Sequence, residues 1–390
     1  MIEKRTMGKT GDSSSILGFG CMRLPLKGPN PSDIDLELAT KMLRAAIDRG
    51  VDYVDTAFPY HGDGGHFDTQ GASEPFVGRA LKDGYREKVK LATKLPTWLI
   101  KSHEDMHKYL DLQLKALETP YIDYYLAHNI NYGVWEPMLK CRLFDFLDEA
   151  VKDGRIRYPA FSFHDDLSLF KVVLGSYDWA MTQLQYNYLD VNFQAGTEGV
   201  KLAFDKGVAV VVMEPLRGGY LTKYMPPEQE GVLKKERPDW SLAAWCLNWL
   251  WNQKEVGVVL SGMSDMSQVE DNLNSAENYS SGLFTAGDAE AVGKIQDYFL
   301  EKKIKVGCTS CGYCLPCPTG VDIPKNFTFL NQLYLFEAEE PKERTKYFYQ
   351  MMLPEDKKAA KCVSCGECVE KCPQQIDIPS ALKNVSIAFR

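Results

Sequence analysis

Short apolar runs alternate with segments of helical periodicity along most of the chain, from Ile16 to about Ala276. Runs of this length, bounded by polar or glycine-containing segments, are typical of buried strands. Eight such runs predict strands, at residues 16–20, 51–57, 88–94, 122–128, 157–163, 180–187, 208–215 and 256–262.

The segments between the predicted strands have the pattern of amphipathic helices. Residues 35–50 carry apolar side chains on one helical face and end at Gly50, a natural C-cap, and a capping box begins another helix at Ser102. Strict alternation of strand and helix predicts a parallel sheet. A closed (β/α)₈ TIM barrel of the α/β class uses all eight strands and leaves no edge, whereas a doubly wound open sheet is the alternative.

The alternating pattern stops near Ala276, and the remainder of the chain has a different character. We expect a barrel domain over residues 1–280, a linker helix over 281–300 and a small, mainly helical, cysteine-rich domain over 301–390.

Composition and charge narrow the classes of function. The 390 residues are 45% hydrophobic and 12% aromatic, which is typical of a globular protein with a large core. A net charge of −8 without a basic run argues against nucleic acid as a partner. The N-terminus lacks a signal-peptide core, and no window of the sequence is apolar enough to span a bilayer. We therefore expect a cytoplasmic protein.

Polar side chains stand at or next to the ends of five predicted strands: Asp55, Lys94, His128, Ser162 and Gln183. These ends surround the mouth of a barrel, where its chemistry takes place. The phenol of the nearby Tyr60 has a reference pKa of about 10, and a lysine ammonium held beside it by a carboxylate would lower that pKa. A histidine on the next strand could stabilise negative charge on a carbonyl oxygen. The set suits reversible hydride transfer to a carbonyl, with Tyr60 supplying the proton.

The chain resembles the aldo-keto reductase family from about Lys4 to Asn272. The motifs "DTAFPYHG", "ATK", "YYLAHN", "QLQYN", "PLRGG" and "SGMS…QVEDN" occur in the family's order. This resemblance implies that Asp55, Tyr60, Lys94 and His128 form a catalytic tetrad, that NAD(H) or NADP(H) is the cofactor, and that Ser162 and Gln183 hold the nicotinamide carboxamide. It implies further cofactor contacts at Met213, Leu216, Gly218, Gly262, Ser264, Gln268 and Asn272.

Some positions depart from the family pattern. Met213 stands where many members have an aromatic residue that stacks on the nicotinamide, and Glu214 replaces a small polar residue beside the pyrophosphate. Where NADP-preferring members place basic residues, this chain has Gly262 and Gln268, with Asp265 nearby. An Arg contact to the 2′-phosphate is therefore missing, and NADH should compete well with NADPH.

Several histidines outside the tetrad invite a functional interpretation. His61 and His66 lie in a long loop, where solvated side chains are favoured over contacts to an anionic substrate. His103 and His107 have the i, i+4 spacing that permits metal binding, but no third ligand is evident, which favours an exposed helix face. His164 follows a strand and either faces the pocket or caps a loop.

Eight of the eleven cysteines lie in two similar runs, "CTSCGYCLPCP" and "CVSCGECVEKCP". In a reducing compartment this pattern indicates metal binding rather than disulfides. Two C-x₂-C-x₂-C…C-P runs predict two [4Fe-4S] clusters with exchanged fourth ligands, and zinc is the alternative. The first cluster would take Cys308, Cys311, Cys314 and Cys372, and the second would take Cys362, Cys365, Cys368 and Cys317. The module resembles helical dicluster ferredoxins, which suggests the iron-sulfur branch of the family.

Hydride transfer moves two electrons together, whereas each cluster passes one. The clusters could therefore carry electrons between the barrel and a ferredoxin- or flavodoxin-like partner, with a flavin as possible mediator, while the barrel interconverts a carbonyl and an alcohol. Two alternatives remain: a plain NAD(P)H-dependent reductase with structural or redox-sensing clusters, and a non-catalytic redox sensor or binding scaffold.

Overall fold

The computed structural model describes residues 1–63 and 67–390, so His66 lies outside the described residues. The described chain divides into two compact units. The first comprises Met1–Gly218 and Asp239–Ala286, and the second comprises Gly219–Pro238 and Gly287–Arg390.

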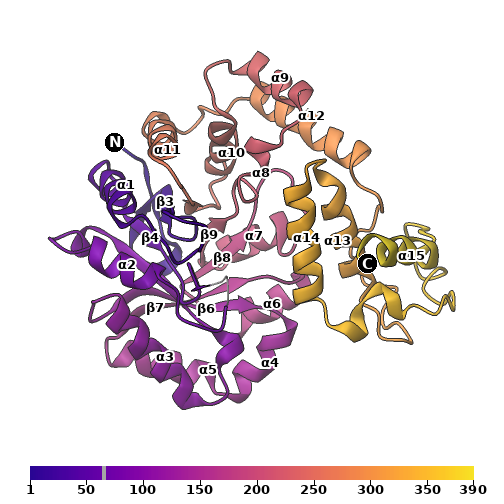
Figure 1. Ribbon diagram of the computed structural model, residues 1–390, viewed down its shortest axis with the longest axis horizontal. Helices are drawn as coiled ribbons and strands as arrows, with labels where there is room; N and C mark the ends of the chain where they lie inside the picture. Colours follow the sequence, from indigo (N-terminus) through magenta and orange to yellow (C-terminus); the bar gives the residue numbers. More distant parts are fainter. Residues whose placement is uncertain (64–66) are drawn as a thin grey trace. The chain divides into compact units, whose positions relative to one another are not determined.

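The first unit contains a closed barrel of parallel strands, which confirms the predicted (β/α)₈ fold and excludes the open sheet (Figure 1). Within the described ranges, the barrel strands follow one another in chain order and the last pairs with the first. They are β3 (Leu17–Gly20), β4 (Tyr53–Asp55), β5 (Lys90–Leu95), β6 (Ile122–Ile130), β7 (Ile156–Phe163), β8 (Met181–Gln185), β9 (Ala209–Met213) and β10 (Val258–Ser261).

Alternation along each strand divides the apolar core into two layers. In β9, Val211 belongs to the cluster inside the barrel, together with Tyr53 and Tyr124. Its neighbours Val210 and Val212 belong to the large outer cluster, which packs under the helices. Strands buried on both faces therefore carry nearly continuous apolar runs, and this is why the sequence pattern predicts them well.

Amphipathic helices surround the barrel, and the helix from His103 begins at the predicted capping box. Asp35 accepts a hydrogen bond from the Leu38 N–H, and Ser102 forms a reciprocal capping box with Asp105. The helices of this unit are α1 (Leu36–Asp48), α2 (Ser73–Ala80), α3 (His103–Ala116), α4 (Tyr132–Lys140), α5 (Leu143–Lys152), α6 (Leu167–Ser176), α7 (Gly196–Asp205), α10 (Leu242–Trp251) and α11 (Met266–Asn278).

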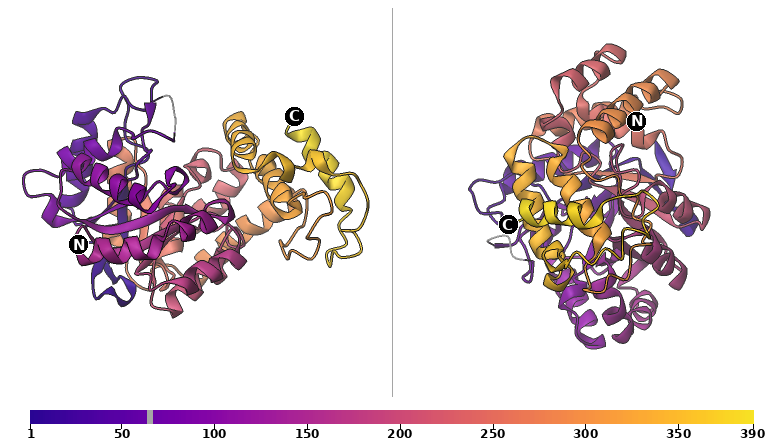
Figure 2. Two further views of the ribbon diagram at one scale, coloured as in Figure 1. Left: turned by 90° about the horizontal axis from the view of Figure 1, so that it is seen from below. Right: turned by 90° about the vertical axis from the view of Figure 1, so that its right-hand side faces the viewer.

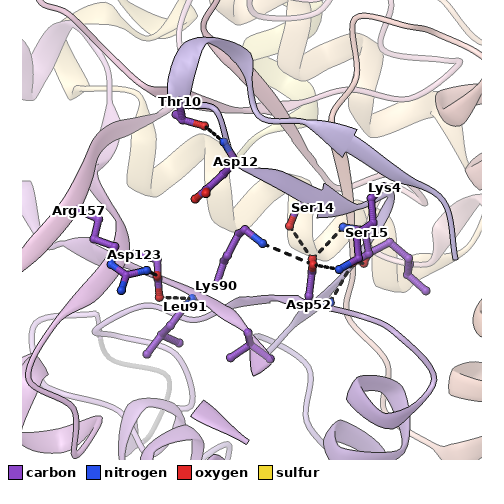
Figure 3. Close-up of polar contacts among 12 residues, drawn as sticks. Lys4, Thr10, Asp12, Ser14, Ser15, Asp52, Lys90, Leu91, Asp123 and Arg157 are labelled. Carbon is purple, nitrogen blue, oxygen red and sulfur yellow. Dashed lines mark hydrogen bonds and ion pairs between the residues drawn. The ribbon is translucent and has the colours of Figure 1, made fainter. Parts of the chain in front are cut away.

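A hairpin of β1 (Lys4–Thr6) and β2 (Ser13–Ser15) precedes the barrel strands and is absent from the sequence prediction. The carboxylate of Asp52, just before β4, accepts hydrogen bonds from Lys4 Nζ at 2.7 Å and from the Ser15 N–H at 2.8 Å (Figure 3). The polar residues of β2 thus donate hydrogen bonds to a buried carboxylate, which is why this strand lacks an apolar pattern.

The second unit is helical and carries the cysteine runs in segments without regular secondary structure (Figure 2). Asp322 caps α13 and Asp377 caps α15, and a proline follows at the second helical position in both cases, so the two Cys-Pro turns lead into matching helices. Its helices are α8 (Tyr220–Lys223), α9 (Pro227–Glu236), α12 (Ala286–Lys302), α13 (Ile323–Leu335), α14 (Glu339–Met352) and α15 (Ile378–Ala388).

The segment Gly219–Pro238 belongs to the second unit although it lies between two barrel strands in the sequence. Arg237 forms a bidentate ion pair with the buried Asp288 of α12. Its Nε lies 2.9 Å from Oδ1 and its Nη2 lies 2.7 Å from Oδ2. Lys223 Nζ and Tyr224 Oη both donate to Glu340 of α14 at 2.5 Å. These long-range contacts account for the difference from the expected division at residue 280. None of the described helices is long and apolar enough to cross a membrane.

Candidate active site

Three of the predicted polar residues meet at the C-terminal ends of β4 and β5. Lys94 Nζ donates to both oxygens of Asp55, at 2.7 and 2.8 Å, and to the Thr56 carbonyl at 2.8 Å. The same ammonium lies 3.4 Å from Tyr60 Oη. Lys94 is 1% exposed, so the ammonium is held in one place by a carboxylate and points at the phenol.

Burial and charge act against each other at this lysine and this tyrosine. Burial alone would lower the pKa of Lys94, but Asp55 and Tyr60 outweigh it, so the pKa is raised and the amine remains cationic. Burial also raises the pKa of Tyr60 above its usual value, and Lys94 opposes this shift without reversing it. The expected net lowering of the Tyr60 pKa is therefore wrong, because desolvation of the phenolate is the larger influence.

His128 lies beside these groups on β6. Its ring centroid is 6.3 Å from that of Tyr60 and 5.2 Å from that of Trp98. Burial and the Lys94 cation lower the pKa of His128 well below its usual value, so the imidazole is neutral at pH 7. Its Nδ1 atom is buried and makes no hydrogen bond to any residue that the structure describes. A neutral imidazole retains one N–H that can be donated to a carbonyl oxygen.

The predicted carboxamide contacts lie on β7 and β8 next to the tetrad. Ser162 Oγ accepts a hydrogen bond from the Asn129 N–H at 2.8 Å, and Gln183 Nε2 lies 3.7 Å from Met213 Sδ. Gln183 Oε1 is buried without a hydrogen-bond donor among the described residues. Because buried polar atoms are normally hydrogen-bonded, this acceptor fits the amide of a bound nicotinamide.

The loop after β9 carries Glu214, whose charge acts on Tyr60. This charge raises the pKa of Tyr60 as a minor influence beside burial. Glu214 Oε1 lies 3.2 Å from Arg23 Nη2. Arg23 follows β3, and its side chain runs beside Gly262. The location of Arg23 just beyond a barrel strand could have marked it in the sequence as a residue of the barrel mouth. The pair offsets the negative charge that we expected Glu214 to bring to the pyrophosphate position.

The remaining predicted cofactor positions lie on the β9 loop and around the start of α11. Leu216 packs against the outer core, and Gly218 has a φ of 72°, which favours glycine. Gln268 Oε1 accepts from the Ser264 N–H at 3.0 Å. Asn272 Nδ2 donates to Ser261 Oγ at 2.8 Å and is buried. Asn272 is thus already engaged within the protein.

Further polar residues, of which only His164 was predicted, lie beyond the tetrad positions. His164 is one of the influences that lower the pKa of His128. Gln194 Nε2 is 3.3 Å from His164 Nδ1, and burial lowers the pKa of His164 to about 4. Arg217 Nε lies 3.6 Å from Asp190, while Arg217 Nη1 is buried and unpaired among the described residues. The charge of Lys94 also acts on the pKa of His164, as a minor influence beside burial.

His61 is a buried structural residue. Its Nε2 accepts from the Leu24 N–H at 3.2 Å, and its Nδ1 lies 2.7 Å from the Pro31 carbonyl oxygen. Only 9% of the residue is exposed. The interpretation as a solvated loop histidine is therefore wrong, because contacts from distant segments enclose the ring.

The two cysteine loops of the second unit have matching backbones. The Ser310 N–H points at Cys308 Sγ and the Ser364 N–H points at Cys362 Sγ, both at 3.4 Å. Both serines have left-handed backbone angles, with φ of 55° and 56°. The matching conformations support an internal duplication, and amides directed at sulfur are typical of iron-sulfur sites.

The thiols gather in two groups that mix the two runs. Burial raises the pKa of Cys308, with Cys311 and Cys372 as neighbouring charges. Burial likewise raises the pKa of Cys368, with Cys362, Cys365 and Cys317 as neighbours. A cavity of this unit is lined by residues that include Cys308, Cys311, Cys314 and Cys372.

The barrel, its mouth and the cysteine loops define an oxidoreductase with an iron-sulfur module. Residues 16–282 match the Aldo/keto reductase family, and residues 307–376 match a 4Fe-4S dicluster domain. The chain therefore belongs to the aldo/keto reductase family, and it carries a 4Fe-4S dicluster domain in addition. The family assignment makes it an enzyme and sets aside the non-catalytic scaffold.

Similar proteins support this assignment. L-galactose dehydrogenase of Arabidopsis thaliana is 28% identical over 295 residues, covering 70% of this chain and 87% of the relative. An aldo-keto reductase of Bacillus halodurans in its holo form is 26% identical with a TM-score of 0.59, covering 76% of this chain and 96% of that one. An aldo/keto reductase from Klebsiella pneumoniae in complex with NADP and acetate shares the fold, with 19% identity, a TM-score of 0.60 and the same coverage.

Proposed function

We propose that the barrel interconverts a small carbonyl compound and its alcohol at Asp55, Tyr60, Lys94 and His128. The observation that carries this proposal is the Lys94 ammonium, held 2.7 Å from Asp55 Oδ1 and 3.4 Å from Tyr60 Oη.

Each of these four residues has a separate role in the proposed carbonyl reduction. Tyr60 is protonated at neutral pH because its pKa is raised, so it can donate its proton to the oxygen of the nascent alkoxide. Lys94 stabilises the phenolate that remains, and Asp55 holds Lys94 in place. The N–H of neutral His128 orients the carbonyl and stabilises charge on its oxygen. In the oxidation of an alcohol the same groups work in reverse.

NADP(H) or NAD(H) is the proposed cofactor, and it would supply or accept the hydride when bound. The NADP complex of the reductase from Klebsiella pneumoniae supports this class of cofactor. Ser162 and the unpaired Gln183 Oε1 would hold the carboxamide. Met213 would take the place of the stacking aromatic residue, and Leu216, Gly218, Gly262, Ser264, Gln268 and Asn272 would line the rest of the site. Arg23 adds a basic group beside Gly262, so how well NADH competes with NADPH now depends on the pairing of Arg23 with Glu214.

We further propose two [4Fe-4S] clusters with exchanged fourth cysteines, as the grouping of the thiols supports. Cys311 and Cys365 are exposed, one in each loop, so each cluster would have an edge at the surface. Surface edges favour electron exchange with a ferredoxin- or flavodoxin-like partner over purely structural clusters. Because hydride carries two electrons and each cluster one, the exchange needs a group that takes up two electrons and passes them singly, and a flavin, a radical-tolerant substrate or the partner protein would serve.

The tetrad is tested by replacing Tyr60 with phenylalanine. The variant should lose about 10²- to 10⁴-fold in kcat/KM for carbonyl reduction, since it lacks the proton donor. Tyr85→Phe is the control, because this exposed phenol contacts Asp48 on the outside of the barrel and should leave turnover unchanged. Unchanged turnover in Tyr60→Phe, measured with NADH and NADPH on a panel of small aldehydes, would refute the mechanism.

A further inference from the structure

Three potential metal ligands converge on the outside of the barrel, between α3 and α5. His103 and His107 lie one helical turn apart on α3, and Glu149 projects from α5. Glu149 Oε2 is 3.1 Å from His103 Nε2 and 3.0 Å from His107 Nε2. The potential ligand atoms of all three lie within 4.8 Å of one another. Glu149 thus stands where a third ligand would, and the sequence pattern did not reveal it.

The hydrogen bonds around His103 direct its Nε2 atom at the centre of this group. The Nδ1 atom of His103 is 3.3 Å from the Cys141 carbonyl oxygen, which can only accept, so Nδ1 carries a proton. In the neutral ring Nε2 then presents a lone pair to a carboxylate oxygen 3.1 Å away. Two acceptors cannot face each other at this distance unless a proton or a metal ion lies between them.

We propose that His103, His107 and Glu149 form a binding site for a divalent transition metal, of which Zn²⁺ is the expected ion. Two imidazoles and a carboxylate are favoured ligands of zinc, and three protein ligands leave the fourth position to water. The Cys141 carbonyl orients His103 as the outer partners of metal-bound histidines do. The ring of Phe146 packs against His107 with centroids 4.9 Å apart and holds that side chain in place.

Arg155 is the group that metal binding must displace. Its Nη2 lies 2.8 Å from His107 Nδ1, and a guanidinium only donates, so without metal His107 carries its proton on Nε2 and donates it to Glu149. A metal ion on Nε2 requires this proton to move to Nδ1, where it would face the Arg155 guanidinium. Arg155 keeps its contacts to Asp111 at 2.9 Å and Asp153 at 2.8 Å when it leaves His107.

The site is proposed to bind metal without hydrolysing a substrate. Residues 103–107 read His-Glu-Asp-Met-His, the H-E-x-x-H spacing of zinc hydrolases, in which the glutamate activates the metal-bound water. Here the Glu104 carboxylate accepts hydrogen bonds from its own N–H and from Ser102 at the start of α3. These bonds turn Glu104 toward the end of the helix rather than toward the metal.

Equilibrium dialysis of the anaerobic holoprotein against Zn²⁺ tests the proposal, with cluster absorbance confirming that the iron-sulfur sites stay occupied. The native chain should bind one more Zn²⁺ than Glu149→Gln, whose affinity should fall about tenfold or more. Asp148→Asn is the matched control, because the neighbouring carboxylate on α5 contacts Tyr177 and not the histidines. Arg155→Gln should bind Zn²⁺ more tightly than the native chain.

A second variant keeps the test decisive if Glu149→Gln folds poorly. His107→Ala removes a ligand from a half-buried position and should also lose the additional Zn²⁺, with the far-ultraviolet circular dichroism unchanged. Equal Zn²⁺ binding by the native chain, Glu149→Gln and His107→Ala would overturn the proposal. So would a native holoprotein that takes up no additional Zn²⁺ at pH 8.

Discussion

Two opposing influences set the pKa of Tyr60. Burial disfavours the phenolate, and the Lys94 ammonium 3.4 Å away favours it. Burial is the larger influence, so the acid form persists at neutral pH. This balance suits the proposed carbonyl reduction, in which Tyr60 would begin the reaction protonated.

The pH dependence of carbonyl reduction follows from this balance. Because the pKa of Tyr60 is raised, kcat/KM limited by this group should stay constant through neutral pH and fall only above about pH 10. In Lys94→Met the opposing cation is gone, so the alkaline fall should move to still higher pH while the rate drops. Profiles measured from pH 6 to 11 provide the check, and an alkaline fall near pH 8 in the native enzyme that Tyr60→Phe removes would contradict it.

At the scale of elements, the β1–β2 hairpin is joined to the barrel by one carboxylate. Asp52 is 6% exposed and contacts Lys4 of β1, Ser14 and Ser15 of β2, and Lys90 of β5. Burial by itself would raise the pKa of Asp52, but these donors together lower it below 3.8. The Asp52 carboxylate, at the end of the barrel opposite the mouth, therefore contributes to stability. The charged residues at the mouth are the ones proposed to take part in catalysis.

Asp52→Asn should lower the free energy of unfolding by about 1–3 kcal/mol at pH 7, since the buried donors lose a charged acceptor. The native pKa lies below the reference value of 3.8, so the contribution is fully present above about pH 4 and is lost as the pH falls through the native pKa. Urea unfolding at pH 7 and pH 3 measures it. Asp48→Asn is the control, because that carboxylate is exposed and its loss should cost little. A difference between Asp52→Asn and the native chain that grows in acid would contradict the assignment.

At the scale of the whole molecule, the chain joins a barrel with a proposed hydride-transfer site to a 4Fe-4S dicluster domain. Cys365 is exposed and has Cys362, Cys368 and Cys317 as companions in the second thiol group. Removing it should affect one cluster and leave the barrel folded, because its companions belong to a separate hydrophobic core.

Cys365→Ala should lose about half of the bound iron, since one of two clusters lacks a ligand. If the clusters carry electrons, reduction of an external electron acceptor at the expense of the alcohol should fall at least tenfold. Cys141→Ala, which alters a cysteine outside the dicluster domain, is the control. Iron analysis, circular dichroism and acceptor reduction measure the outcome, and unchanged acceptor reduction despite the loss of iron would favour structural clusters.

Much of the fold could be predicted because its signals are local. Strands such as Ala209–Met213 are continuous apolar runs, and helix starts such as Ser102 have their capping partners within three residues. The hairpin over Lys4–Ser15 escaped prediction because its serines satisfy a carboxylate far along the chain. That residues 219–238 group with the second unit is hidden from the sequence for the same reason, since Arg237 pairs with Asp288, 51 residues away.

By itself, the sequence determined the barrel, the strand ends that carry Asp55, Lys94 and His128, and the two cysteine runs. Each depends on periodicity or spacing between neighbours in the chain, which backbone geometry converts directly into shape. Only the tertiary structure decided that Arg23 pairs with Glu214, that His61 is enclosed, and that Glu149 meets His103 and His107. These meetings join residues dozens of positions apart, and packing of whole elements, rather than any local pattern, brings them together.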